Sequence, residues 1–266
     1  MFLTTQALVL RVVAYNDTDS LLTLLSKDQG KLTVKARGLR RKNSPLAAPC
    51  QLLAYGEFTL FEYRGMYTIN EAQRIELFQQ LRKDLDLLSL GTYFAQAAEV
   101  VSQEDLPNPE LLSLVLNCLH GLSSLGITAN KAKAVFELRL ACLAGYTPDL
   151  SSCHGCNNVY PDRFDISQGI LECNQCRDHS SAGIRMPLNP GILDAMRYIC
   201  KCDRKRLFSF ELSDQSVRDL SYITESYLTT QLERSFSALD FYKSLIADAH
   251  DTIGGSLCLS DLKNLL

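Results

Sequence analysis

The stretch SLLTLLSKDQGKLTVKARGLRRK, residues 20–42, decides how the N-terminal part of the chain folds. Two strand-like segments, Ser20–Ser26 and Gly30–Arg37, flank the turn-forming sequence KDQG, which is typical of two strands joined by a tight turn. In the second segment the period of two predicts an apolar face of Leu32, Val34 and Ala36. The opposite face would then carry Lys31, Thr33, Lys35 and Arg37, and Gly38 would end the strand.

Three further segments of the same character surround this pair of strands. They are Leu8–Tyr15, Leu52–Tyr63 and Met66–Leu77, rich in Leu, Val, Phe, Tyr and Thr and separated by turn signals. Five strands in so short a space, with no helical period between them, predict a small closed barrel over residues 1–79. The five-stranded OB-fold is the first candidate and an SH3-like barrel is the alternative.

From residue 80 onward the apolar residues recur at helical spacing. Helices are expected over Asp84–Val101, from the sequence PNP at 107–109, over Lys131–Ala144 and over Ser213–Arg234. The sequence therefore predicts an α+β protein of two domains. Residues 1–79 would form the barrel domain, and residues 80–266 would form an α-helical domain interrupted by a cysteine-rich, zinc-finger-like insert at 150–180.

The insert SSCHGCNNVYPDRFDISQGILECNQC has the spacing C-x2-C-x16-C-x2-C, through Cys153, Cys156, Cys173 and Cys176. Two such pairs can place four thiolates around one tetrahedral zinc ion. A site closed by four thiolates has no open position for water, so the zinc would be structural rather than hydrolytic. Two redox-active or disulfide-bonded pairs are the alternative. The neighbouring His154 and His179 are not needed as ligands.

Composition narrows the functional class further. The 266 residues contain no apolar run of about 18 residues that would span a bilayer, and the start lacks the features of a signal peptide. We therefore expect a cytoplasmic protein, in which ten cysteines favour metal binding or free thiols over disulfides. No phosphate-binding glycine loop, HExxH sequence or GxSxG elbow occurs, so we expect no enzymatic activity.

Six basic residues and no acidic one lie within residues 31–42, although the whole chain has a net charge of -3. They are Lys31, Lys35, Arg37, Arg40, Arg41 and Lys42. A cationic strand face continued by a cationic loop predicts a surface that contacts the phosphates of nucleic acid. A merely solvated polar face is the alternative. Phe61 and Tyr63 would share one face of their strand, where they could stack on bases or fill the core.

Two longer blocks resemble a known family. The run TTQALVLRVVAYNDTDSLLTLLSKDQGKLTVKARGLRRKNSPLAAPCQLL is similar to the start of the RecO family of recombination mediators, with YNDTD after the first strand and the basic block after the GK turn. The sequence FELRLACLAGYTPDLSSCHGC resembles that family's third helix running into its zinc-binding loop. The likeness covers nearly the whole chain in order. Some members of the family lack the cysteines.

The resemblance implies an OB-fold followed by a helical domain with a structural Zn²⁺. It implies DNA repair and recombination through the RecF pathway, with binding of single- and double-stranded DNA and annealing of complementary strands. It also implies partnership with RecR, contact with the acidic tail of single-stranded DNA-binding protein, and help in loading RecA on coated strands. Two alternatives stay open, namely a zinc-ribbon scaffold that binds only proteins and a redox protein that uses its C-x2-C pairs.

The resemblance also suggests where a partner's tail would bind. An acidic peptide with an apolar end needs a hydrophobic slot with a cation at its rim. The third helix, in KAKAVFELRLACLAG, offers Leu138 on its apolar stripe and Arg139 on the flank, with Lys131 and Lys133 near the start. The alternative is that Arg139 forms an ordinary ion pair, for instance with Glu137.

Overall fold

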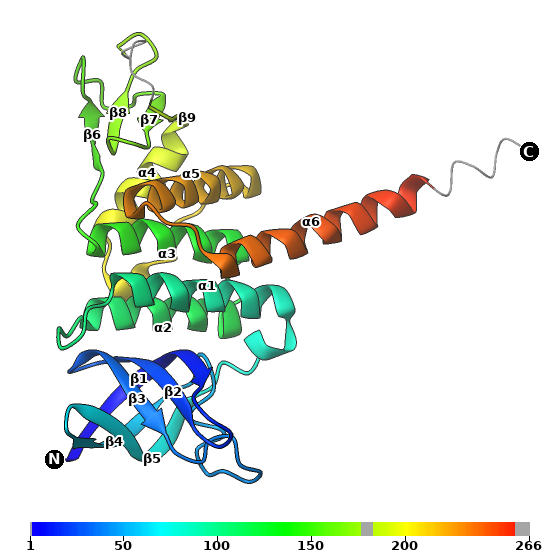
Figure 1. Ribbon diagram of the computed structural model, residues 1–266. Helices are drawn as coiled ribbons and strands as arrows, with labels where there is room; N and C mark the ends of the chain where they lie inside the picture. The colour runs from blue at the N-terminus through cyan, green and yellow to red at the C-terminus, as the bar shows by residue number, and fades with distance from the viewer. Residues whose placement is uncertain (1, 177–182, 259–266) are drawn as a thin grey trace, which may run out of the picture.

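The computed structural model describes residues 2–176 and 183–258, with the side chains of 248–258 left out. Figure 1 shows three layers stacked along the long axis: the β-barrel, a group of helices, and a small sheet at the far end. The last helix projects away from the body. No helix among the described residues is long and apolar enough to cross a membrane.

Five strands close into the N-terminal barrel in the order β1-β2-β3-β5-β4. They are β1 (Phe2–Ala14), β2 (Ser20–Ser26), β3 (Gly30–Ala36), β4 (Tyr55–Tyr63) and β5 (Met66–Glu76). All neighbouring pairs are antiparallel except the short parallel contact between β3 and β5. The predicted five-stranded OB-fold is confirmed, and with the helical part it gives the predicted α+β class.

The strand ends differ from the prediction at two places. β1 begins at Phe2 rather than Leu8, because its first residues pair with β4 in the register Phe2↔Phe61. β4 begins only at Tyr55, because Leu53 adopts a left-handed backbone conformation with φ of 63° and stays in a turn. The apolar composition of this segment did not reveal the turn, in which Leu53 is nevertheless buried.

Six α-helices follow the barrel in the part of the chain that the structure describes. They are α1 (Leu85–Val101), α2 (Pro109–Ser124), α3 (Ala129–Leu143), α4 (Pro190–Lys201), α5 (Asp214–Leu232) and α6 (Ser237–Cys258). Two short 3-10 helices, η1 (Leu81–Lys83) and η2 (Arg204–Arg206), lie in the connections. Asp84 and Asn108 cap α1 and α2 by accepting hydrogen bonds from backbone N–H groups of the first turn, which fixes where these helices start.

The helix α3 is the centre of the helical domain, and it differs from the predicted one-sided stripe. It packs against α5, α2, α4 and α1, and nine of its fifteen residues are buried while none is exposed. A helix surrounded by other helices has buried residues around its circumference rather than on one face. Its two buried charges, Lys133 and Glu137, form an ion pair with a distance of 3.0 Å between Nζ and Oε1.

The barrel and the helices share one hydrophobic core. Leu8, Leu10 and Leu25 point out of the barrel and join the cluster formed by the helices, while a second cluster fills the barrel itself. Gly30 lies at this junction with φ of +70°, and a Cβ atom there would lie 2.4 Å from the carbonyl oxygen of Leu106. The close approach of the two parts therefore requires glycine at this position.

The insert forms a four-stranded sheet in the order β6-β8-β7-β9. Its strands are β6 (Asp149–Cys153), β7 (Arg163–Asp165), β8 (Ile170–Glu172) and β9 (Arg185–Pro187). A largely buried ion cluster holds the last strand, because the Arg185 guanidinium lies 2.8 Å from Glu172 and 3.5 Å from Asp165. The sheet thus spans a somewhat longer stretch than residues 150–180.

Candidate functional site

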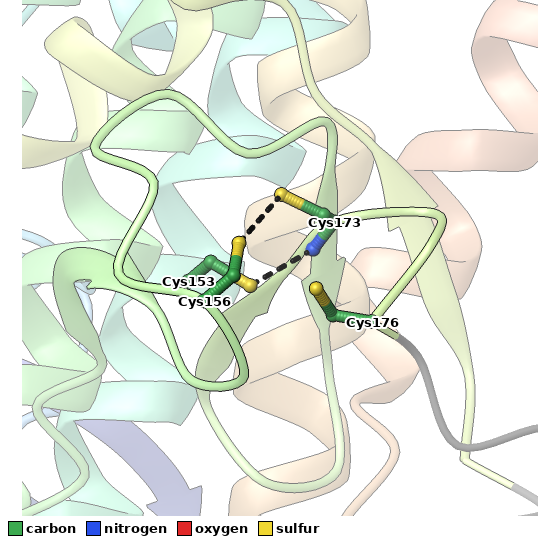
Figure 2. A group of neighbouring side chains, drawn as sticks. All are labelled: Cys153, Cys156, Cys173 and Cys176. Carbon is green, nitrogen blue, oxygen red and sulfur yellow. Dashed lines mark hydrogen bonds between the residues drawn. The ribbon is translucent and has the colours of Figure 1, made fainter.

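The four cysteines of the insert meet at one end of its sheet (Figure 2). Cys153 is the last residue of β6, and Cys173 follows directly after β8. Because β6 and β8 pair in parallel, with Cys153 opposite Leu171, the two C-x2-C turns lie side by side. All four Sγ atoms lie within 4.8 Å of one another.

The distances fit a tetrahedral metal site. With metal–sulfur bonds of about 2.3 Å, the sulfur atoms of a four-thiolate zinc site lie roughly 3.8 Å apart. The Sγ atoms of Cys156 and Cys173 are 3.7 Å apart. The N–H of Cys173 donates to the Sγ of Cys153, and the side-chain amide of Asn158 donates to the Sγ of Cys173. Such donors stabilise thiolates, the form that binds metal.

The thiolate form of Cys153 is stabilised by its surroundings as well. Burial raises the pKa of its thiol, but backbone N–H groups, that of Cys173 first, outweigh burial and lower the pKa to about 6. Gly155 allows the turn to close, since a Cβ atom there would lie 2.8 Å from the Cβ of Cys176. All four cysteines are free thiols, and His154 is exposed beside them. His179 lies outside the described residues.

The basic stretch occupies β3 and the loop after it. Lys31 and Lys35 lie on the outward side of β3, and Arg37, Arg40, Arg41 and Lys42 follow in the exposed loop. Three of these six cations, Arg37, Arg41 and Lys42, line a surface hollow of about 340 Å³ together with Ile69 and Asn70 of β5. No ion pair neutralises these three cations within the described part of the chain.

The other three cations have partners that the local sequence did not reveal. The Lys35 ammonium lies 3.0 Å from Asp19, a residue of the β1–β2 connection. The N–H of Gly38 and then the Lys35 ammonium hold the pKa of the Asp19 carboxyl well below its usual value. Arg40 donates to the carbonyl of Asn16, and Lys31 donates to the carbonyl of Glu99 in α1.

The two barrel aromatics face solvent rather than the core. Phe61 is 40% exposed and Tyr63 is 60% exposed. Phe61 packs beside Phe2 with ring centroids 5.2 Å apart, and the Arg64 guanidinium lies over the Tyr63 ring. Sequence reasoning missed Phe2, because it began the first strand too late. The alternation of β4 placed Phe61 and Tyr63 on one face correctly.

The residues proposed to bind a partner's tail are only partly accessible. Leu138 is fully buried and Lys133 is 3% exposed, so neither can meet a peptide, because α3 is surrounded by other helices. Lys131 donates to the carbonyl of Phe210. Arg139 donates to the carbonyls of Ile199 and Cys200 at the end of α4 and forms no ion pair with Glu137.

Arg139 nevertheless borders a surface cavity of about 260 Å³. Leu114, Leu143 and Leu207 form its apolar lining, and Arg139 and Arg204 bring two guanidinium groups to it beside the carboxylates of Glu110 and Asp203. The cavity lies between α2, the end of α3 and the connection after α4, so its apolar residues come from three separate segments. Sequence reasoning identified Arg139 but could not identify the leucines or Arg204.

Comparison with known proteins gives a consistent result along the chain. The family model described as Recombination protein O N terminal matches residues 1–78, and the one described as Recombination protein O C terminal matches residues 82–240. These two segments coincide with the barrel and with most of the helical part.

Whole-length relatives are similar as well. The chain is 34% identical to the DNA repair protein RecO of Acetivibrio thermocellus, over 92% of this chain and 97% of that protein. It is 30% identical to the protein of the same name from Alkaliphilus metalliredigens, over 92% of this chain and all of that protein. With the one from Bacillus subtilis, identity is 26% over 84% of this chain and 86% of the relative.

Proposed function

This chain belongs to the RecO family of DNA repair proteins, and from that membership we propose that it binds single- and double-stranded DNA through its barrel. In this role it anneals complementary strands and helps RecA to load on strands coated with single-stranded DNA-binding protein, with RecR as its partner. It acts without catalytic chemistry, in the bacterial cytoplasm at the nucleoid.

One observation carries the DNA-binding proposal. In a chain of net charge -3, Arg37, Arg41 and Lys42 gather around one hollow of the barrel and form no ion pair within the described part of the chain. Phosphate groups of a DNA backbone are the ligands that such an uncompensated cluster attracts, and the released counterions make the binding depend on salt. The exposed Phe61 and Tyr63 add rings on which bases can stack.

Salt-dependent binding to oligonucleotides tests this interface. The variant Arg37→Ala/Arg41→Ala should weaken binding to all sequences alike and flatten the plot of log K against log salt by about 0.7 for each single-strand phosphate that is no longer bound. Lys201→Ala/Arg218→Ala is a matched control, because it removes the same charge from exposed positions of α4 and α5. Equal slopes for both variants and the parent would mean that the basic loop is only solvated surface.

Annealing tests the activity itself. Complementary oligonucleotides coated with single-stranded DNA-binding protein should anneal faster when the chain is added, and the double variant should lose that effect. A zinc-ribbon scaffold without DNA binding is the alternative function. It predicts no salt-dependent affinity for naked DNA and no acceleration of annealing.

We also assign a structural Zn²⁺ to the four cysteines. The compact tetrad, the donors to its sulfur atoms and the C-x2-C-x16-C-x2-C spacing support zinc rather than a redox role. The ion would join the two turns of the insert sheet, and such sites contribute on the order of 10 kcal/mol to local folding. All four ligand positions are filled by protein, so the metal leaves no position for substrate.

For the tail of single-stranded DNA-binding protein we propose the cavity bordered by Arg139. Its leucines suit an apolar peptide end, and Arg139 with Arg204 can meet carboxylates. Lys131 lies at the other end of α3 and is at most a remote contributor, and Leu138 and Lys133 act through the packing of α3. The site is therefore centred on the cavity rather than on the face of one helix.

A further inference from the structure

A second cationic cavity lies where the barrel meets the helical domain, and no part of the proposed function uses it. It has a volume of about 480 Å³, within the usual range of ligand sites. Arg11 of β1 and Lys31 of β3 contribute from the barrel, and Gln96 and Glu99 contribute from α1. The short connection between α5 and α6 closes it with Arg234, Ser235 and Ser237.

The charges around this cavity do not cancel. The Glu99 carboxylate lies 2.9 Å from the Arg11 guanidinium and neutralises it. Lys31 donates to the carbonyl of Glu99 rather than to a carboxylate. The Arg234 side chain is exposed and has no hydrogen bond or ion pair within the described part of the chain. Two positive charges therefore remain available to an anion.

The wall that carries Arg234 is fixed in place. The side-chain amide of Gln96 donates to the Ser237 hydroxyl, and its oxygen accepts a hydrogen bond from the N–H of Ala238. Phe236, which precedes Ser237, is buried against the ring of Tyr93. The connection is thus held against α1, and the Arg234 backbone cannot swing far from the cavity.

Lys31 links the cavity to the basic stretch of the barrel, because it lies on the same outward side of β3 as Lys35. In the strand register, Arg11 of β1 lies opposite Thr23 of β2, and Thr23 lies opposite Thr33 of β3. Arg11 is therefore on the same side of the sheet as Thr33, the exposed residue in the middle of β3. Lys31 lies at one end of β3, and Arg37 follows its other end beside the barrel hollow. Lys31 and Arg37 are six residues apart along an extended strand, which corresponds to a distance of about 20 Å.

We propose that the junction cavity is a second phosphate subsite for single-stranded DNA, in which Arg234 and Lys31 bind the backbone of a strand that also occupies the barrel hollow. The strand would run along the outward face of β3, past Lys35. At the roughly 3.4 Å rise per nucleotide along the axis of a stacked strand, the two subsites would be about six nucleotides apart. This inference rests on the proposed DNA binding and extends it to residues of the helical domain.

Phosphodiesters fit this cavity better than a peptide carboxylate does. The lining is mainly polar, with two serine hydroxyls and an amide beside the cations, and it lacks the group of leucines found around Arg139. A phosphate offers several oxygen acceptors to such donors. Moreover, Lys31 lies on β3, the strand that leads into the loop of Arg37, Arg41 and Lys42, whereas a peptide site would not require that connection.

The variant Arg234→Ala tests the proposal in the full-length protein. Its side chain makes no hydrogen bond or ion pair within the described part of the chain, so the thermal unfolding midpoint should stay unchanged. For a long oligothymidylate we expect affinity to fall roughly tenfold, as for one charged hydrogen bond, and the salt slope to flatten by about 0.7. Arg234→Lys should restore most of the slope, and Arg218→Ala, an equally exposed arginine on α5, should change neither quantity.

A series of oligothymidylate lengths gives a second readout. In the parent, the shortest strands should bind through the barrel hollow alone, and affinity should show a second increase once the strand is about six nucleotides long and can reach both subsites. In Arg234→Ala this second increase should be absent, while binding of the shortest strands through the barrel hollow remains.

Three results would overturn the proposal. If Arg37→Ala/Arg41→Ala flattens the salt slope but Arg234→Ala leaves the slope and the length dependence unchanged, the junction cavity is not a DNA subsite although the barrel is. If Arg234→Ala instead abolishes binding of an acidic peptide and leaves DNA binding intact, the cavity is a peptide site. If the parent shows no salt-dependent DNA binding at all, the proposed function itself fails.

Discussion

Replacing Lys133 with methionine is expected to destabilise the helical domain strongly, because this lysine is the cation of a buried network that joins three helices. Its ammonium lies 3.0 Å from Glu137 of α3 and 2.8 Å from Glu225 of α5, and it also donates to the carbonyl of Ser221. Tyr93 of α1 donates its hydroxyl to Glu137 at 2.9 Å. Lys133 and Glu137 are almost inaccessible to water.

The expected loss in the free energy of unfolding comes from the buried negative charge that the substitution leaves unpaired. Methionine fills much of the same volume, but it leaves the buried Glu137 carboxylate without a cation and leaves Glu225 paired with Lys243 alone. Removing one partner of a buried pair costs about 3–5 kcal/mol in the free energy of unfolding. For a chain of this size, each kcal/mol lowers the unfolding midpoint by roughly 2–4 °C. Lys243→Met is the control, because the Lys243 side chain is 55% exposed and its ion pair with Glu225 should contribute at most about 1 kcal/mol.

The pH dependence distinguishes a buried charge from a change in packing. Burial raises the pKa of Glu137 above its ordinary 4.5, and this effect outweighs the opposing influence of Lys133. Without the lysine, the pKa in the folded state should rise further. A raised carboxyl pKa favours the folded state at pH values below the unfolded pKa, and this advantage is lost as the pH rises through the folded pKa. The stability deficit of Lys133→Met should therefore be small near pH 4 and full at neutral pH.

Chemical denaturation of the parent, Lys133→Met and Lys133→Met/Glu137→Gln at several pH values checks this reasoning. The double variant should recover part of the loss at neutral pH, because it removes the buried negative charge. A loss below about 1 kcal/mol, or an equal loss at every pH, would mean that the network does not stabilise the domain in this way.

Three further predictions concern the candidate sites. Cys173→Ser should lose bound metal and stability together, as measured by elemental analysis and thermal unfolding, whereas the control Cys142→Ser should keep its metal. A parent protein that contains no metal and whose stability does not change with chelator would contradict the zinc assignment. Arg139→Ala should abolish binding of an acidic, apolar-ended peptide in fluorescence anisotropy without changing DNA binding, and equal peptide affinity would place the tail site elsewhere. Asp19→Asn should free the charge of Lys35 and make the salt slope of DNA binding steeper by up to about 0.7, and an unchanged slope would show that Lys35 does not contact phosphate.

Local patterns predicted the elements of this fold well. The alternation in β3 predicted its buried and outward residues, because a strand with one face on a core must repeat every two residues. The spacing of the four cysteines predicted their meeting, because each C-x2-C turn brings its own pair of sulfurs together. Apolar spacing from Asp84 and the sequence PNP at 107–109 predicted the starts of α1 at Leu85 and of α2 at Pro109 closely.

Contacts between distant segments could not be predicted in the same way. The carboxylate of Asp19 neutralises Lys35 across a strand connection, although the sequence around Lys35 contains no acidic residue. The helix α3 looked one-sided, yet three-dimensional packing covers it from all directions and buries Lys133. The cavity beside Arg139 takes its leucines from three segments, and no spacing rule connects them.

The way in which the barrel meets the helices also bears on how a strand of DNA could be held. The barrel does not hang from a flexible linker, because Leu8 and Leu25 belong to the core of the helical domain. The N–H of Lys31 donates to the carbonyl of Gln103, and Gly30 allows the two segments to approach closely there. The barrel hollow and the junction cavity are therefore separated by a nearly constant distance. A strand that fits one subsite is positioned for the other without a further loss of conformational freedom in the protein, which favours affinity through preorganisation.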